Sequence, residues 1–113
     1  MKISARNALD LWRGAVTETV RSRGPDLTAR QLAIMLCVYL TEPPHTVRGL
    51  ATDLKLRKPA VTRALDKLEQ LGFARRKSDP DDARSILVQR TVRGSVYLSD
   101  FGDLVVRTAR QIS

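Results

Sequence analysis

The spacing of apolar residues changes at Gly72, and this change constrains the fold more than any other feature. The apolar residues before it recur every three or four positions, which predicts an amphipathic helix; they are Val61, Ala64, Leu65, Leu68 and Leu71. After it, residues 73–77 and 85–90 predict two β-strands, and the turn-rich residues 78–84 separate them. The helix therefore leads, through a glycine suited to a helix C-terminus, into a β-hairpin with a long tip.

Helical patterns also precede and follow this pair of elements. Residues 3–22 predict a first helix, and Val92 begins a last helix that continues to the end of the chain. The second helix has a complete start signal, because Thr28 and Gln31 stand at the positions of a capping box. A short third helix carries the apolar stripe Val47, Leu50, Ala51 and Leu54. The predicted fold class is mainly α (α+β), in a single domain of residues 1–113.

Two short helices joined by a tight turn, with basic residues at the start of the second, are typical of a helix-turn-helix. The hairpin that follows makes this a winged helix-turn-helix, in which the hairpin is the wing. The second helix of such a motif lies in the major groove and meets base edges with its N-terminal residues. The predicted DNA contacts of this recognition helix are Arg57, Lys58, Pro59, Ala60, Thr62, Arg63 and Lys67. Those of the wing are Arg75, Arg76, Lys77 and Arg84.

The positive charge of the chain gathers in the same segment. The net charge is +8, and residues 57–93 hold 10 of the 20 Lys and Arg residues against 5 of the 12 Asp and Glu residues. Cations clustered in this way neutralise phosphates and release counterions. An RNA-binding protein would show the same charge, and the run 75–77 alone also fits a solvated edge strand whose charges prevent aggregation.

Other chemistries find little support in the sequence. Cys37 lies in an apolar helix without nearby positive charge, so we expect it to pack as a small hydrophobe. His45 is the only histidine and predicts a loop or strand residue, and one His with one Cys makes no metal site. Phosphate-binding loops, catalytic carboxylate pairs and nucleophile–base sets do not stand out. We therefore expect no enzyme, metal or cofactor, no membrane span, and a cytoplasmic, nucleoid-associated protein.

In this region the chain resembles the MarR family of winged-helix transcription regulators. The resemblance covers residues 27–94, about 60% of the chain, and depends on many short matches in family-like order and spacing. They are Leu27-Thr28 with Gln31, Thr46-Val47, Leu50-Ala51, Leu54, Leu56, Val61-Thr62-Arg63, Asp66, Leu68-Glu69, Gly72-Phe73, Asp79-Pro80, Asp82-x-Arg84 and Thr91-x-x-Gly94.

The resemblance implies a homodimer that regulates transcription, more commonly by repression, from a pseudo-palindromic site in double-stranded DNA. Residues 27–94 would form the DNA-binding lobe, while the helices of residues 1–26 and 95–113 would pair. Asp82 occupies the position of a carboxylate that orients the wing arginine, Arg84. The predicted dimerisation residues are Leu9, Trp12, Val16, Tyr97, Phe101, Leu104 and Val105.

Three positions depart from the family pattern. Ala83 stands where a second wing arginine is common, Arg57 where a capping serine is common, and Arg90 where a leucine is usual. The terminal segments also look shorter than usual. Three other functions remain open: a winged-helix protein-interaction module, a nonspecific architectural or RNA-binding protein, and a regulator that senses a small-molecule effector. The pocket of such a regulator would lie between the terminal helices and the DNA-binding lobe.

Overall fold

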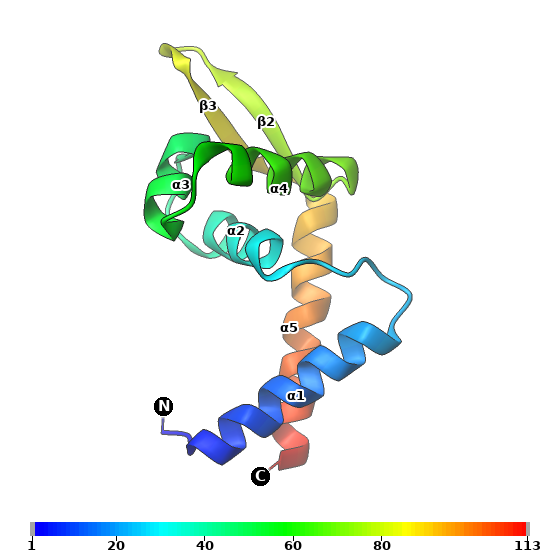
Figure 1. The fold of residues 1–113 in the computed structure, drawn as a ribbon. Coiled ribbons are helices and arrows are strands. Elements are labelled where there is room, and N and C mark those ends of the chain that lie inside the picture. The colour runs from blue at the N-terminus through cyan, green and yellow to red at the C-terminus, as the bar shows by residue number, and fades with distance from the viewer. Residues whose placement is uncertain (1, 113) are drawn as a thin grey trace. The chain divides into compact units, whose positions relative to one another are not determined.

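A computed structural model describes residues 2–112 and confirms the predicted winged helix-turn-helix (Figure 1). Most of the described residues are helical, and the strands form one antiparallel sheet. The elements in chain order are α1 (Ala5–Arg21), α2 (Ala29–Leu40), β1 (His45–Thr46), α3 (Val47–Leu54), α4 (Lys58–Gln70), β2 (Ala74–Asp79), β3 (Asp82–Arg90) and α5 (Val92–Ile112).

The chain divides into two compact units. Residues 27–96 form one, which we call the central unit. Residues 2–26 and 97–112 belong to the other, which we call the terminal unit. The helix-turn-helix and the wing therefore lie together in the central unit, whereas α1 lies with most of α5.

The core of the central unit forms where α2 and α3 pack on α4. Its largest fully buried side chains are Ile34, Met35, Val38, Leu50, Val61, Leu65 and Leu68. The capping box at the start of α2 is confirmed, because the Thr28 hydroxyl accepts from the Gln31 backbone N–H at 3.2 Å and the Gln31 side-chain oxygen accepts from the Thr28 N–H at 2.9 Å. Lys55 ends α3 in the left-handed conformation, with φ 55°, and so begins the turn toward α4.

The wing is longer, and its tip tighter, than the sequence predicted. β2 and β3 stay paired as far as Asp79 and Asp82, so the expected long loop of residues 78–84 is wrong. The side chain of Asp79 gives the physical reason, because its Oδ1 accepts a hydrogen bond from the backbone N–H of Asp81 at 2.9 Å. Such a local bond stabilises a tight turn, and the strands can therefore continue almost to the tip.

A short third strand completes the sheet. β1 pairs His45 with Val88 and Thr46 with Leu87, which gives the strand order β1-β3-β2. His45 is therefore a strand residue, one of the two alternatives that the sequence allowed. Thr46 also caps α3, because its hydroxyl accepts from the backbone N–H of Gly49 at 2.9 Å. The first helix of the helix-turn-helix is thus fixed directly to the sheet of the wing.

The base of the wing joins the start of α5 through a partly buried polar network around Tyr39. Its hydroxyl donates to the Phe73 carbonyl at 2.7 Å and accepts from the Thr91 backbone N–H at 2.9 Å. Gly94 lies against this hydroxyl so closely that a Cβ at this position would stand 1.9 Å from the Tyr39 oxygen. The close approach explains why only glycine fits in this first turn of α5.

The terminal unit buries one face of α1 and leaves another exposed. Ala15 is fully buried, and a Cβ added at Gly14 would lie 2.3 Å from the Thr108 side chain of α5. The small residues of α1 thus let the two helices approach closely. A second apolar stripe of α1 lies exposed and consists of Leu9, Trp12, Val16 and Val20. The helices of residues 2–112 include none that is long and apolar enough to cross a membrane.

Candidate nucleic-acid interface

The exposed face of α4 carries the residues predicted to read DNA. Arg57 precedes the helix as its N-cap residue and makes no capping bond through its side chain, because guanidinium offers no acceptor. Exposed side chains at or along the helix are those of Arg57, Lys58, Pro59, Arg63 and Lys67, while Ala60 and Thr62 are half-buried. The opposite face fills the core. The N-terminal half of α4 is therefore held rigidly while its polar face meets solvent.

A small hollow of about 70 Å³ brings three cations of separate elements together. Lys58 comes from α4, Arg84 from β3 and Arg48 from the first turn of α3. The hydroxyl residues Thr46 and Ser85 and the carboxylate of Asp82 also line it, so the cations outnumber the anion by three to one. Convergent cations raise the local positive potential and can neutralise a phosphate group. Sequence reasoning missed Arg48, although an exposed cation at the start of the first helix of a helix-turn-helix is a usable signal.

A wider, open hollow lies where the first turn of α2 meets α4. Its volume is about 500 Å³, and Arg30 and Arg63 are its two cationic lining residues. Arg30 follows the N-cap of α2, where the helix dipole also favours an anion. The predicted residue Arg63 is thus accompanied by a cation that the sequence analysis did not select.

The outer face of the wing carries solvated cations. Arg75 and Lys77 are exposed, and the Arg75 guanidinium only reaches the Gln89 side-chain oxygen, at 3.5 Å. The Arg84 side chain is 89% exposed. Asp82 Oδ1 accepts from the Arg84 backbone N–H at 3.0 Å and lies 3.9 Å from the Arg84 Nε. The carboxylate therefore fixes the backbone of the wing arginine and leaves its guanidinium accessible.

Arg76 lies in different surroundings from the other predicted wing residues. Its Nη2 donates to Asp66 Oδ1 at 2.6 Å and to Glu69 Oε1 at 2.7 Å, and its Nε donates to Glu69 Oε1 at 3.0 Å. Hydrogen bonds from Arg76 lower the pKa of the Glu69 carboxyl, and the Glu69 carboxylate raises the pKa of Arg76. The guanidinium is thus occupied by two carboxylates of α4.

Arg90, which departs from the family pattern, is also occupied within the fold. Its Nε donates to the Val38 carbonyl at 2.8 Å and its Nη2 to the Thr41 carbonyl at 3.0 Å. The guanidinium also lies 6.0 Å from the centre of the Tyr39 ring. A cation that binds the last carbonyls of α2 satisfies acceptors that the helix leaves open and complements its dipole.

The predicted dimerisation residues fall into two groups within the terminal unit. Trp12 is 55% exposed and Leu9 is 67% exposed, so neither belongs to the core of this chain. Val16 is also exposed, while the predicted residues of α5 are half-buried; they are Tyr97, Phe101, Leu104 and Val105. The exposed group is the part that could bind a second protein.

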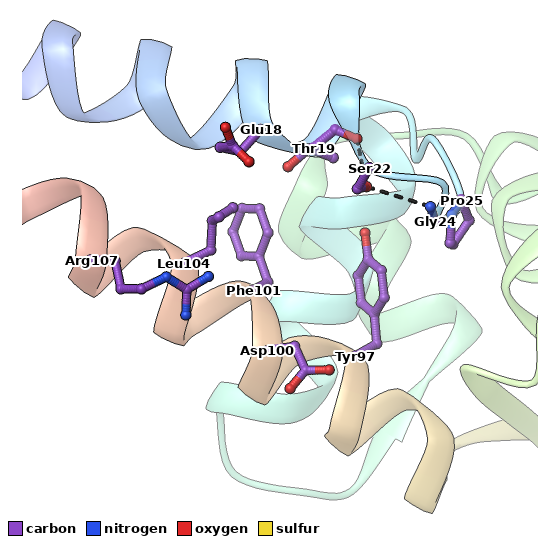
Figure 2. A pocket seen from close by; sticks show the side chains of 10 residues that line it. All are labelled: Glu18, Thr19, Ser22, Gly24, Pro25, Tyr97, Asp100, Phe101, Leu104 and Arg107. Carbon is purple, nitrogen blue, oxygen red and sulfur yellow. Dashed lines mark hydrogen bonds between the residues drawn. The ribbon is translucent and has the colours of Figure 1, made fainter.

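A further hollow of about 300 Å³ lies between the end of α1 and α5, and its lining residues all belong to the terminal unit. Figure 2 shows Tyr97 and Phe101 pointing from α5 toward α1 and the loop that follows it. The charged side chains at the hollow are Glu18, Asp100 and Arg107. Burial, and then the nearby Asp26 carboxylate, raise the pKa of Tyr97.

The structure also places Cys37 and His45, the two residues that the sequence analysis considered for redox and metal chemistry. Cys37 is a free thiol, half-buried in α2. His45 approaches the carbonyl oxygen of Thr41 at 3.2 Å. Residues 2–112 contain no group of three His, Cys, Asp or Glu side chains that could hold a metal ion.

Comparisons with known proteins agree on one family. The model of the MarR family matches residues 27–86. The chain is 33% identical over 84 residues to the HTH-type transcriptional regulator YkoM of Bacillus subtilis, covering 74% of this chain and 54% of that protein. It is 30% identical over 89 residues to the multiple antibiotic resistance protein MarR of Escherichia coli, covering 76% and 59%. The chain thus spans little more than half the length of these relatives. Among solved structures, the regulator BldR of Sulfolobus solfataricus matches with a TM-score of 0.66 and 25% identity, over 95% of this chain and 77% of that one.

Proposed function

The chain belongs to the MarR family, and from that premise we propose that it is a transcription regulator that binds double-stranded DNA in a sequence-specific manner. One observation carries the proposal: Arg48, Lys58 and Arg84, from three separate elements, surround one hollow beside the exposed start of α4. A module that binds only proteins has no need of such convergence. The matched relative of this chain in Bacillus subtilis is named as a transcriptional regulator. This agrees with the expectation from the sequence that the chain is not an enzyme.

The binding mechanism follows from the division of labour among these cations. Exposed cations of α4 and of the hollow neutralise phosphates and fix the register of the protein on the duplex. The N-terminal half of α4 then enters the major groove, where Lys58 and Arg63 can donate to base edges. Arg84 extends from the wing into the adjacent minor groove, whose negative potential is deepest where A·T pairs narrow it.

We further propose that the chain acts as a homodimer on a pseudo-palindromic site. The exposed stripe of Leu9, Trp12, Val16 and Val20 on α1 supports this, because a contiguous apolar surface of a helix usually marks a protein interface. Trp12→Ala should shift the sedimentation coefficient toward that of a monomer. Arg13→Ala, at an exposed neighbour outside the stripe, is the control. A Trp12→Ala variant that sediments like the wild type would remove α1 from the interface.

Selection of bound duplexes from a random DNA pool tests the main proposal. The expected result is a pseudo-palindrome with half-sites about one helical turn apart, bound about 10³-fold or more tightly than scrambled DNA. Arg63→Ala should weaken that binding. Salt-sensitive binding without sequence preference would favour the architectural or RNA-binding function, and no binding would favour the protein-interaction module. Repression would follow if the selected site overlaps a promoter and blocks polymerase.

The hollow of the terminal unit favours sensing of a small molecule as a second function. Its volume of about 300 Å³ is at the lower end of ligand pockets, and aromatic side chains with a few charged groups are their usual lining. A panel of small aromatic compounds that leaves both the melting temperature and the DNA affinity unchanged would count against this function.

A further inference from the structure

Most of the wing extends without support from a third strand. In the described part of the chain, β1 pairs only with Leu87 and Val88, so residues 78–86 have hydrogen-bonded partners only within the hairpin. Figure 1 shows β2 and β3 continuing beyond the body of α4. An isolated two-stranded ribbon is marginally stable in water, and its twist is larger than that of a wider sheet. The direction of the wing must therefore be set by side chains that connect it to the helix beneath.

A cluster of three charged residues makes that connection; we call Asp66, Glu69 and Arg76 the wing lock. Besides the guanidinium bonds described above, Glu69 Oε2 accepts from the backbone N–H of Arg76 at 3.3 Å. One carboxylate thus binds both the side chain and the main chain of the same strand residue. Because β2 is an edge strand, this bond also satisfies an outward-facing N–H that would otherwise attract another strand.

We propose that the wing lock sets the angle between the wing and the recognition helix, and that Arg76 is a positioning residue for DNA binding rather than a DNA contact. The inference rests on the proposed function and revises the role expected for Arg76. The two ends of the lock lie on the two elements that must reach adjacent grooves at once, α4 and the wing. The guanidinium is held at several points, because Nε and Nη2 both donate to Glu69 Oε1 and Nη2 also donates to Asp66 Oδ1. Charge-assisted bonds of this kind are short and strong, and several of them together fix direction as well as distance.

The location of Arg76 separates this role from that of a phosphate contact. Its side chain is only 25% exposed, compared with 89% for Arg84. A phosphate that approached Nε or Nη2 of Arg76 would have to displace Asp66 or Glu69, and these carboxylates would repel it. In the DNA-bound protein the role of Asp66 and Glu69 is therefore to hold Arg76, and with it the wing, in position.

Substitution of Glu69 provides the sharpest test, because electrostatics and positioning predict opposite results. Glu69→Gln removes a negative charge next to the DNA surface, which should strengthen binding if charge alone matters. If the lock positions the wing, the same change should weaken specific binding about tenfold, as expected when one well-placed contact such as that of Arg84 is lost. Asp53→Asn, which removes an equal charge from an exposed position of α3, is the matched control and should not weaken binding.

Arg76→Gln and a charge-swapped pair complete the experiment. Arg76→Gln should weaken binding to a similar degree without changing the slope of log K against log salt, whereas loss of a phosphate contact decreases the magnitude of that negative slope by about 0.9 per contact. The Glu69→Arg/Arg76→Glu double variant keeps the net charge and should recover most of the affinity. Tighter binding by Glu69→Gln, a shallower salt slope for Arg76→Gln, or no recovery in the swapped pair would each overturn the proposal.

A measurement without DNA keeps this test separate from the proposed function. Hydrogen exchange of the free protein should become faster in residues 75–86 of Glu69→Gln, while the amides of α2 remain as protected as in the wild type. If the wild type binds no DNA specifically, the proposed function fails, yet the exchange data still report whether the lock orders the wing. Unchanged exchange in the wing would overturn the lock itself.

Discussion

The two faces of strand β2 hold cations in very different surroundings, although these residues are neighbours in sequence. Arg75 and Lys77 lie exposed on the outer face, whereas Arg76 between them is paired with two carboxylates of α4. Successive side chains of a strand point to opposite faces, so a run of three cations does not form one patch. Charge that is clustered in sequence divides into a solvated part, which can meet a polyanion, and a paired part, which organises the fold.

Strand β3 repeats this division along its length. Arg84 near the tip is almost fully exposed, whereas Arg90 at the base binds the last carbonyls of α2. The comparison yields a rule that can be tested. Substitution at the inner face or the base of the wing should cost stability and leave the salt dependence of DNA binding unchanged. Substitution at the outer face should leave stability unchanged and reduce that salt dependence.

The largest effect is expected where the base of the wing meets α5. Gly94→Ala would place a Cβ 1.9 Å from the Tyr39 hydroxyl and 2.5 Å from the Phe73 carbonyl. Overpacking of this kind costs about 1–3 kcal/mol, and displacement of the hydroxyl would also leave partly buried polar groups unpaired. Urea denaturation should therefore show a large loss of stability.

Gly102→Ala provides the control for this substitution within the same helix. A Cβ at Gly102 meets nothing within 4 Å, so alanine should stabilise α5 by up to about 1 kcal/mol through its higher helix propensity. Opposite signs at the two glycines would support the close approach at Tyr39. Equal effects at both would contradict it.

A smaller loss of stability is expected for Arg90→Ala. The substitution removes two charge-assisted hydrogen bonds to the Val38 and Thr41 carbonyls, and because Arg90 is partly exposed we expect a cost of about 1–2 kcal/mol. The unfolding midpoint in urea measures it. The slope of log K against log salt should stay at the wild-type value. A shallower slope would place Arg90 among the phosphate contacts instead.

The outer face should show the reverse behaviour. Lys77→Ala should change stability by less than about 0.5 kcal/mol, as is usual for an exposed position. The negative slope of log K against log salt should decrease in magnitude by about 0.9 per lost phosphate contact, and hence by about 1.8 if the protein binds as a dimer. Filter-binding titrations at several salt concentrations give this slope. A wild-type salt slope together with a lowered unfolding midpoint in urea would mean that Lys77 contributes to stability rather than to phosphate binding.

The elements themselves could be predicted from the sequence because their signals are local. The capping box of Thr28 and Gln31, the stripe of α4 and the glycine after it depend on residues close together in the chain, and the structure confirms them. The tip of the wing was wrong because turn-forming residues suggested a loop. The Asp79 side chain instead closes a tight turn and lets both strands continue.

The role of each cation was harder to predict because it depends on contacts between distant residues. Alternation along β2 places Arg76 on the same side as the buried Ala74, so the signal that separates it from its neighbours was present in the sequence. Its partners on α4, and the approach of Arg90 to α2, depend on how the elements pack. Arg48 likewise joins Lys58 and Arg84 only after three elements have assembled.

The smallest expected effect is on the pH dependence of stability in acid. It should differ between a residue of the inner face of β2 and a residue of the outer face. Hydrogen bonds from Arg76 lower the pKa of Glu69 below its ordinary value of 4.5. A carboxyl whose pKa is lowered by folding contributes stability that is fully present above its unfolded pKa and is lost as the pH falls through the folded value. Unfolding of the wild type should therefore show a dependence on pH below about 4.5 that is reduced in Arg76→Gln but kept in Lys77→Ala. Because Lys77 and Arg76 carry the same charge on adjacent residues, only a paired Arg76 can produce that difference.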